Sequence, residues 1–441
     1  MNADEMRAEI LSRIPAYFCE NWPEEEFVPG VSRVRIGARV FGAHEIVYLV
    51  DAALDFWLTA DRYATKFEKA LQSFLGVRGA LLCNSGSSAN LLAISALTSK
   101  ELPDTRLNPG DEVITVAAGF PTTVNGIFQN GLVPVFVDIE PETYNVDTSL
   151  LEEAYSERTR AVMLAHTLGH PFDVKGVRDF CDRHRLWLIE DNCDALGSKY
   201  DGRYTGTFGD MATQSFFPAH HITMGQGGAV VTRSPLLACI VRSFRDWGRD
   251  CWCDAGKENT CGKRYNWQKG DLPYGYDHKY TYSHVGYNLS ITDLQAAIGC
   301  AQIERLPGFI KERKRNWLRL RAGLDDLQEF FVLPQARPNC DPSWFGFALR
   351  VRPEAPFNRL DVILNLAVHR IDTRLLFAGN LAKQPAYHGL NFRVPGKVLP
   401  NTDDAMLNAF WLGVYPGLND KALDYVIEVL HDFVKMPHGQ A

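Results

Sequence analysis

The sequence predicts an α/β fold, with a mainly parallel sheet of seven strands followed by a smaller α/β domain. Short apolar runs alternate with helix-like segments between about residues 80 and 232. Each run has the length of a strand that is buried on both faces, and such alternation is typical of helices covering a parallel sheet. The runs are Ala80–Cys83, Glu112–Ala118, Val133–Ile139, Ala161–His166, Leu186–Glu190, Ala212–Phe217 and Gly228–Thr232.

The remaining chain divides around this sheet. Residues 1–75 have helical composition and form an expected N-terminal helical segment, and residues 76–305 form the large domain. Within that domain, residues 251–282 lack periodicity and predict a long functional loop. The stretch Thr292–Arg305 opens on a capping residue and predicts a strong helix. Residues 306–441 mix helix and strand patterns and form the expected small domain.

Bulk composition excludes several protein classes. A net charge of −7 disfavours a nucleic-acid partner, because nucleic-acid binding usually requires a basic face. The first residues mix acids and bases without the apolar stretch of a signal peptide, and no run approaches the roughly 18 apolar residues of a membrane-spanning helix. We therefore expect a cytoplasmic protein, in which the ten cysteines are unlikely to form structural disulfides.

Two strand ends carry residues suited to binding. Asn84–Asn90 is a Ser/Gly turn between a strand and a helix, where backbone N–H groups and the helix dipole favour an anion; a capped helix start without ligand is the alternative. Leu186–Asp191 is an apolar strand that ends in two acids, and at a strand's carboxyl end a carboxylate faces the ligand crevice of an α/β sheet; a solvated strand end without ligand is the alternative. Ser215–His221 places two histidines after another strand, where a base, metal ligands or surface residues are all compatible with the pattern.

Four cysteines form a separate pattern. Cys251, Cys253 and Cys261 give a C-x-C-x7-C spacing in the irregular loop, and Cys193 lies two residues after the strand with the two acids. Four thiolates hold either zinc or an iron–sulfur cluster, and the spacing alone does not choose between them.

Together the motifs resemble the DegT/DnrJ/EryC sugar aminotransferase/dehydrase family of fold-type I pyridoxal phosphate enzymes. The resemblance covers roughly residues 35 to 435. In that family a lysine five residues after the serine of a Ser-Phe pair holds the cofactor covalently; here that residue is His220, five after Ser215. The resemblance thus implies non-covalent pyridoxamine 5'-phosphate (PMP, the amine form of PLP), with His220 as a base. The matching stretches are Gly110–Thr115, Phe120, Glu190–Asp191, Ser215–Phe216, Gly225–Gly228 and Gly286–Asn288.

His220 combined with the four cysteines resembles the iron–sulfur-dependent 3-dehydrases of this family. The resemblance implies a [2Fe–2S] cluster on Cys193, Cys251, Cys253 and Cys261 and removal of the 3-hydroxyl from a nucleotide-linked 4-keto-6-deoxyhexose in 3,6-dideoxysugar biosynthesis. The expected substrate is CDP-4-keto-6-deoxy-D-glucose, and a TDP-linked 4-keto sugar would undergo the same ring chemistry. Electrons would come from a separate reductase, a ferredoxin or a flavodoxin.

The resemblance also implies residue roles. Gly86, Ser87 and Ser215 would bind the cofactor phosphate, and Phe120 would stack on the pyridine ring. The other implied positions are Asp191 at the pyridine nitrogen, Asp194 close to the cofactor, and Asn288 at the phosphate of a neighbouring subunit, which implies a homodimer.

Other classes of function remain open at this point. An ordinary sugar aminotransferase or a redox-independent dehydrase with a structural metal is the second hypothesis, and the missing lysine argues against the aminotransferase. The third is a non-catalytic relative that binds the nucleotide sugar without turnover.

Overall fold

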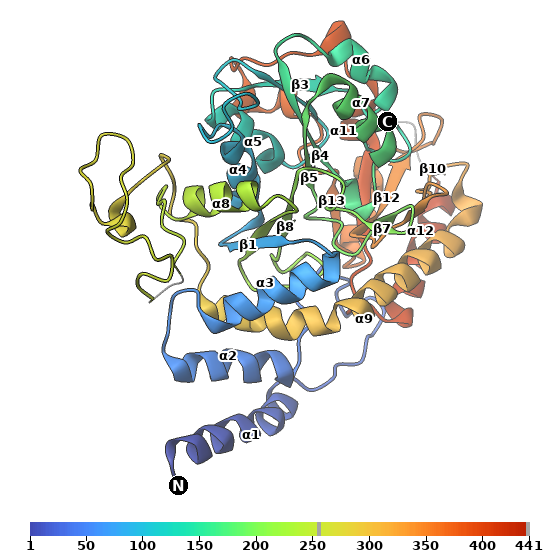
Figure 1. The fold of residues 1–441 in the computed structure, drawn as a ribbon. Helices are drawn as coiled ribbons and strands as arrows, with labels where there is room; N and C mark the ends of the chain where they lie inside the picture. Colours follow the sequence, from blue (N-terminus) through green and yellow to red (C-terminus); the bar gives the residue numbers. More distant parts are fainter. Residues whose placement is uncertain (254–256, 438–441) are drawn as a thin grey trace.

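The central element of the computed structural model, which describes residues 1–253 and 257–437, is a seven-stranded sheet (Figure 1). Its strand order is β1-β9-β8-β5-β4-β2-β3. Strand β9 runs antiparallel to both neighbours, and the other adjacent pairs are parallel. The predicted mainly parallel seven-stranded sheet is confirmed. Its strands are β1 (Gly79–Cys83), β2 (Glu112–Val116), β3 (Val133–Val137), β4 (Thr159–Ala165), β5 (Trp187–Asp191), β8 (Met211–Ser215) and β9 (Gly228–Thr232).

Alternate residues of the strands pack against helices on opposite faces, because successive side chains of a strand point to opposite sides. Leu81 packs with helices α4 (Gly86–Leu97) and α8 (Pro235–Arg245). Leu82, the next residue, packs with α3 (Arg62–Leu75) and α9 (Asp293–Gly323) on the other face. Both faces are therefore apolar, which explains the continuous hydrophobic runs of the sequence. Also against the sheet lie α5 (Pro121–Gln129), α6 (Leu151–Ala154) and α7 (Val174–His184).

The N-terminal segment is helical. Helices α1 (Ala3–Asn21), α2 (Ala43–Asp55) and α3 (Arg62–Leu75) precede the sheet, and α2 and α3 pack along α9 (Asp293–Gly323) (Figure 1). Thr292 caps α9 in a reciprocal capping box with Gln295, as the sequence predicts. The helix is longer than the predicted stretch, because buried residues recur at helical spacing up to Leu320.

The C-terminal part contains a second sheet of four antiparallel strands in the order β10-β12-β14-β13. Helix α9 runs continuously through residue 305 into this part, and the predicted domain boundaries stay a prediction. A small third sheet joins β11 to β6 and β7. The bounds are β6 (Lys199–Tyr200), β7 (Arg203–Tyr204), β10 (Phe331–Val332), β11 (Cys340–Asp341), β12 (Gly346–Val351), β13 (Thr373–Leu375), β14 (Ala409–Gly413), α10 (Arg359–Val368), α11 (Pro400–Asn408) and α12 (Asp420–Lys435).

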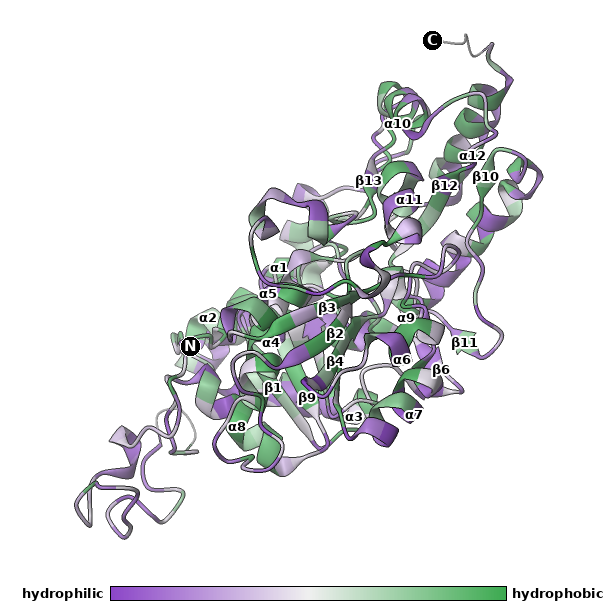
Figure 2. Ribbon diagram, turned by 90° about the horizontal axis from the view of Figure 1, so that it is seen from above, coloured by the Kyte–Doolittle hydropathy of each residue, from purple (hydrophilic) through white to green (hydrophobic). Residues whose placement is uncertain are grey.

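In its described residues, the segment between α8 and α9 is irregular apart from a short 3-10 turn at His278–Tyr280. It projects from the body beyond α8 in both views, and Figure 2 shows its described residues as mainly hydrophilic, whereas hydrophobic residues are frequent in the sheet and its helices. Residues 254–256 of the predicted iron–sulfur loop, 251–282, lie outside the described residues. Throughout residues 1–253 and 257–437, every helix is too short or too polar to cross a bilayer.

Candidate functional site

Asp191 ends β5 at the carboxyl edge of the sheet, and neighbouring elements hold its carboxylate. Its Oδ2 accepts hydrogen bonds from Asn90 Nδ2 at 2.9 Å and Thr123 Oγ1 at 2.7 Å. The register of the parallel strands places Thr213 of β8 directly beside it. A buried carboxylate fixed in this way can bind a pyridinium N–H by a charge-assisted hydrogen bond.

The N-terminus of α4 forms a close-packed turn next to this carboxylate. The Ser85 hydroxyl caps the helix by accepting from the Ser88 N–H at 3.1 Å. A Cβ at Gly86 would lie 2.5 Å from Cβ of Ser215, so only glycine fits between β8 and the turn. Ser87 is exposed beside it. Gly86, Ser87 and Ser215 are thus brought together, with helical N–H groups suited to a phosphate.

His220 lies after β8 and contacts two polar side chains. Its Nδ1 is 3.3 Å from Oγ of Ser215, and its Nε2 is 3.5 Å from Oδ1 of Asp194. Burial raises the pKa of the Asp194 carboxyl, and the contact with His220 partly offsets this rise. The pair can hold and move a proton, with Asp194 stabilising the imidazolium.

Phe120 precedes α5 and leaves 54% of its surface exposed, in edge-to-face contact with Phe377 at 6.3 Å between ring centroids. Phe217, in the turn after β8, is 47% exposed. An exposed aromatic ring at the edge of a polar site is suited to stacking on a planar cofactor.

Arg313 of α9 is a site residue that the sequence analysis missed. Its guanidinium is buried and donates to the backbone oxygens of His220 at 3.0 Å and Trp344 at 3.2 Å. Burial lowers its pKa to about 10, with Asp194 acting in the opposite direction. The guanidinium of Arg313 thereby fastens the turn that carries His220 to the C-terminal part. No sequence pattern distinguishes Arg313 from the other basic residues of α9.

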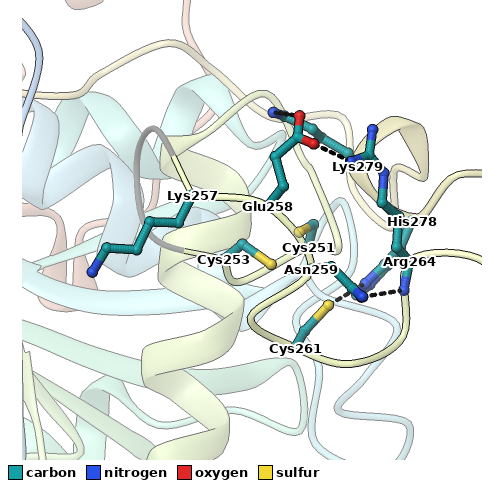
Figure 3. Close-up of a pocket in the computed structure, with 9 residues that line it drawn as sticks. All are labelled: Cys251, Cys253, Lys257, Glu258, Asn259, Cys261, Arg264, His278 and Lys279. Atoms are coloured by element: carbon teal, nitrogen blue, oxygen red, sulfur yellow. Dashed lines mark hydrogen bonds and ion pairs between the residues drawn. The ribbon is translucent and has the colours of Figure 1, made fainter.

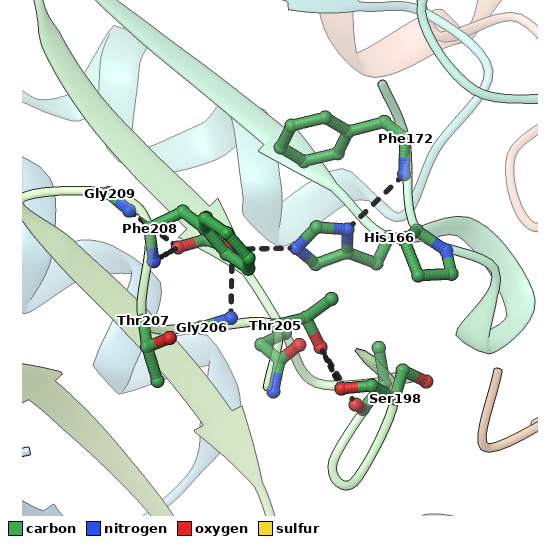
Figure 4. Close-up of polar contacts among 12 residues, drawn as sticks. His166, Phe172, Ser198, Thr205, Gly206, Thr207, Phe208 and Gly209 are labelled. Atoms are coloured by element: carbon green, nitrogen blue, oxygen red, sulfur yellow. Dashed lines mark hydrogen bonds and ion pairs between the residues drawn. The ribbon is translucent and has the colours of Figure 1, made fainter. Parts of the chain in front are cut away.

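Glu190, next to Asp191, points to the other face of the sheet, because successive side chains of a strand alternate, and Figure 4 shows its partners His166, Gly206 and Phe208. Its oxygens accept hydrogen bonds from His166 Nε2 at 3.0 Å and from the N–H groups of Gly206 at 2.8 Å and Phe208 at 2.7 Å. Burial opposes ionisation, yet these donors lower the pKa of Glu190. Of the two acids, Glu190 is therefore structural, and Asp191 is the one near the Gly86 turn.

The loop cysteines form a second polar group, away from the sheet. Among the described residues, ligand atoms of Cys251, Cys261 and His278 all lie within 4.8 Å of one another. Cys253 lines the same pocket, and Figure 3 shows the sulfurs turned toward a shared space. Although burial acts the other way, hydrogen bonds including one from Thr260 lower the pKa of Cys253 to about 7, whereas burial raises that of Cys251 to about 11.

His278 is the metal-site candidate that the sequence analysis did not include. Its Nδ1 lies 3.3 Å from Sγ of Cys261, and its Nε2 lies 3.4 Å from Oδ2 of Asp250, an ion-pair distance without hydrogen-bond alignment. A carboxylate behind an imidazole is the arrangement that orients metal-binding histidines. The donor set of soft thiolates with one imidazole suits zinc or an iron–sulfur centre.

Cys193 is not part of that group in this chain. Its sulfur lies 4.0 Å from Thr213 Oγ1 and 3.2 Å from the position of a Cβ at Gly86, inside the sheet-edge site.

Asn288 belongs to neither group: its backbone forms an isolated β-bridge with Asp246 after α8, and its side chain is exposed. The structure thus gathers seven of the predicted site residues at the sheet edge, with Phe120 at the rim of that site. It places three of the predicted cysteines together in the loop and leaves Asn288 on the surface. The seven are Gly86, Ser87, Asp191, Cys193, Asp194, Ser215 and His220.

The sheet-edge residues fit a PLP-type cofactor. A helix N-terminus without a side chain at Gly86, a fixed carboxylate at Asp191 and an exposed ring at Phe120 match its phosphate, pyridine nitrogen and ring face. The described loop residues fit a metal centre, with three thiols and one imidazole.

Comparison with known proteins finds relatives that match nearly the whole chain. The chain is 53% identical over 433 residues to the lipopolysaccharide biosynthesis protein RfbH of Salmonella typhimurium, covering 98% of this chain and 99% of that protein. It is 51% identical to dTDP-4-dehydro-2,6-dideoxy-D-glucose 3-dehydratase of Saccharopolyspora spinosa, covering 98% and 94%. The solved E. coli GDP-4-keto-6-deoxy-D-mannose-3-dehydratase with bound hydrated PLP superposes with a TM-score of 0.81 at 26% identity, covering 90% of this chain and 100% of that one.

A family model described as the DegT/DnrJ/EryC1/StrS aminotransferase family matches residues 41–431, which include both polar groups described above. The predicted resemblance and the fold-type I architecture are confirmed. The chain belongs to the DegT/DnrJ/EryC1/StrS aminotransferase family.

Proposed function

We propose that this protein is a cytoplasmic, homodimeric, PMP-dependent nucleotide-sugar 3-dehydratase that also uses a [2Fe–2S] cluster. Membership of the family supports a PLP or PMP enzyme acting on a nucleotide-linked sugar. The proposed reaction removes the 3-hydroxyl of a 4-keto-6-deoxyhexose, with CDP-4-keto-6-deoxy-D-glucose as substrate, in 3,6-dideoxysugar biosynthesis.

The observation that carries the proposal is His220 at the place of the family's lysine, in contact with Asp194. An imidazole cannot hold PLP covalently, but it moves protons near neutral pH. Bound PMP would supply the amine that joins the 4-ketone and a pyridine ring that accepts electrons.

The residues of the chain would share the remaining tasks. Asp191 would keep the pyridine nitrogen protonated, and Gly86 and Ser87 would bind the phosphate through N–H groups. His220 would take a proton from the C4′ carbon of PMP, and Asp194 would stabilise the resulting imidazolium. Phe120 would hold the ring face and limit access of water.

The proposal of a cluster rests on the loop thiols together with Cys193. Net removal of the hydroxyl as water leaves an unsaturated product that needs two electrons and two protons to become the 3-deoxy sugar. A [2Fe–2S] centre on Cys193, Cys251, Cys253 and Cys261 would pass these electrons singly from a separate reductase, ferredoxin or flavodoxin. Asn288, exposed after the loop, would reach the phosphate of the neighbouring subunit.

One observation favours a second candidate. Three thiols with His278 also form a zinc-type donor set, which would make the enzyme a redox-independent dehydrase with a structural metal.

Anaerobic purification followed by metal analysis, EPR and assay tests both candidates. We expect about two irons and two acid-labile sulfides per chain, a rhombic EPR signal after one-electron reduction, and 3-deoxy product from the CDP sugar only with a reductant. Zinc in place of iron, with water elimination that needs no reductant, would overturn the redox proposal in favour of the second candidate. Faster turnover of the TDP-linked sugar would correct the nucleotide.

A further inference from the structure

The proposed cluster ligands lie in two places in one chain. Cys193 marks the first: its sulfur lies 3.2 Å from the position of a Cβ at Gly86, at the N-terminus of α4. Its backbone N–H donates to Asp191 Oδ1 at 3.2 Å, which ties it to the cofactor end of β5.

The loop cysteines are tied to the other end of α4. His278, which contacts Cys261, lies 3.4 Å from Asp250, and Asp250 pairs with Lys269 at 3.0 Å. Lys269 in turn lies 3.5 Å from Glu101, which follows the C-terminus of α4. This chain of contacts anchors the cysteine group beside the end of the helix.

A second tether joins the same end. His284 Nε2 lies 2.7 Å from Ser99 Oγ, and its Nδ1 lies 2.8 Å from Ser243 Oγ of α8. Tyr287 Oη lies 3.1 Å from Ser95 Oγ. The C-terminal side of the loop base is thus fixed to the last turn of α4, to Ser99 just after it, and to α8.

The length of α4 separates the two groups. Its 12 residues span about 18 Å at the helical rise of 1.5 Å per residue. Metal–thiolate bonds are about 2.3 Å long, so four sulfurs on one small cluster must lie within a few ångströms of its metals. In the described fold one chain therefore does not bring Cys193 to the cluster of Cys251, Cys253 and Cys261.

The surface beside the loop is open to a second copy. Val285 is 96% exposed, and Tyr282 is 51% exposed. Asn288, three residues after Val285, is also exposed. The loop projects away from the body in Figures 1 and 2. These exposed side chains beside the projecting loop are available to a second copy of the chain.

We propose that the cluster is assembled between subunits, with Cys251, Cys253 and Cys261 of one protomer and Cys193 contributed by the other. The inference rests on the proposed iron–sulfur function and homodimer. Each dimer then holds two such clusters, and each lies beside the cofactor site of the subunit that supplies Cys193. Electrons would thus enter the sheet-edge site from the loop of the opposite subunit.

A mixed dimer tests this arrangement. Cys193→Ser and Cys261→Ser chains carrying different tags are co-expressed, and the mixed dimer is isolated anaerobically by both tags. One of its two sites then combines an intact Cys193 with an intact loop. We expect about half the wild-type iron and EPR signal in the mixed dimer, and no cluster in either variant alone.

A pair of loop variants, Cys251→Ser with Cys261→Ser, is the matched control, because neither chain has an intact loop and no iron is expected. Binding of PMP, followed by its absorbance, checks that each variant is folded. An iron-free mixed dimer, beside an iron-loaded wild type, would overturn the proposal. So would an iron-loaded monomer in sedimentation analysis.

The contact between His278 and Cys261 defines the rival within one chain. If Cys193→Ser alone keeps full iron while His278→Ala loses it, His278 is the fourth ligand and the arrangement between subunits is wrong. A wild-type protein without iron would instead refute the proposed redox function itself, so the two failures are distinguishable.

Discussion

Nε2 of His220 lies 3.5 Å from Oδ1 of Asp194, and both side chains are mostly buried at the carboxyl edge of the sheet. Asp194 follows β5, whereas His220 follows β8, so the pair exists because these strands are parallel neighbours. A carboxylate beside an imidazole stabilises its protonated form and fixes its ring. The proposed base thus has its partner on the adjacent strand.

Replacement of His220 by Asn should leave PMP binding and iron content unchanged and lower dehydration at least about 100-fold, because the proton acceptor is lost. Single-turnover product formation and cofactor absorbance measure the two effects. His221→Asn is the contrast, since His221 is buried and bonded to the Ser343 carbonyl at 2.7 Å; it should lower stability more than the chemical step. Turnover at the wild-type rate in His220→Asn would refute the assigned role.

Asp194→Asn should lower turnover by roughly 10- to 100-fold with little change in cofactor affinity, because the imidazolium loses its carboxylate. Burial raises the pKa of Asp194, so its ionisation contributes to the acid limb of the rate profile. We expect that limb to move in the variant, measured as kcat against pH. An unchanged profile would show that Asp194 only packs against His220.

Cys253→Ala should abolish iron binding and keep PMP binding, because Cys253 lines the loop pocket and lies apart from the sheet-edge site. Iron and sulfide analysis together with cofactor absorbance check both parts. The exposed Cys239 of α8 offers a matched control as Cys239→Ala, which should retain the metal. Wild-type iron content in Cys253→Ala would contradict the ligand assignment.

Glu190→Gln should destabilise the fold by about 2–4 kcal/mol at neutral pH, because buried N–H donors and His166 lose a carboxylate partner. The pKa of Glu190 is lowered from 4.5, so its stabilisation is complete above that value and is lost as pH falls below it. The difference in unfolding free energy from wild type should therefore shrink below about pH 4. Denaturant unfolding at several pH values, with the exposed Glu142→Gln as control, measures this; a constant difference would contradict the account.

Arg313→Lys should reduce stability by about 1–3 kcal/mol and lower kcat more than it raises KM, since one ammonium cannot serve four carbonyl oxygens. Those oxygens belong to Ala219, His220, Trp344 and Phe345. Thermal unfolding and steady-state kinetics test the variant. Lys314→Met is the control, because Lys314 forms an ion pair with the exposed Asp341, and an equally large effect there would refute the clamp.

Much of the fold follows from local sequence. The seven apolar runs appear as strands within a few residues of their predicted limits, because a strand buried on both faces needs a continuous apolar stretch. The cap at Thr292 is also local chemistry, confirmed by its bond with Gln295. Helix α9 extends past its predicted end because its later residues are held by contacts with the C-terminal part.

The candidate site divides in the same way. By itself the sequence determined the histidine at the lysine position, the acids that end β5 and the spacing of the loop cysteines, since these are matters of residue identity and order. Only the tertiary structure decided that Asp194 faces His220, that Arg313 fastens the turn carrying His220, and that His278 joins Cys251 and Cys261 while Cys193 lies at the other end of α4. These relations join residues far apart in the chain, and their distances are set by strand order, helix length and packing, which no local pattern encodes.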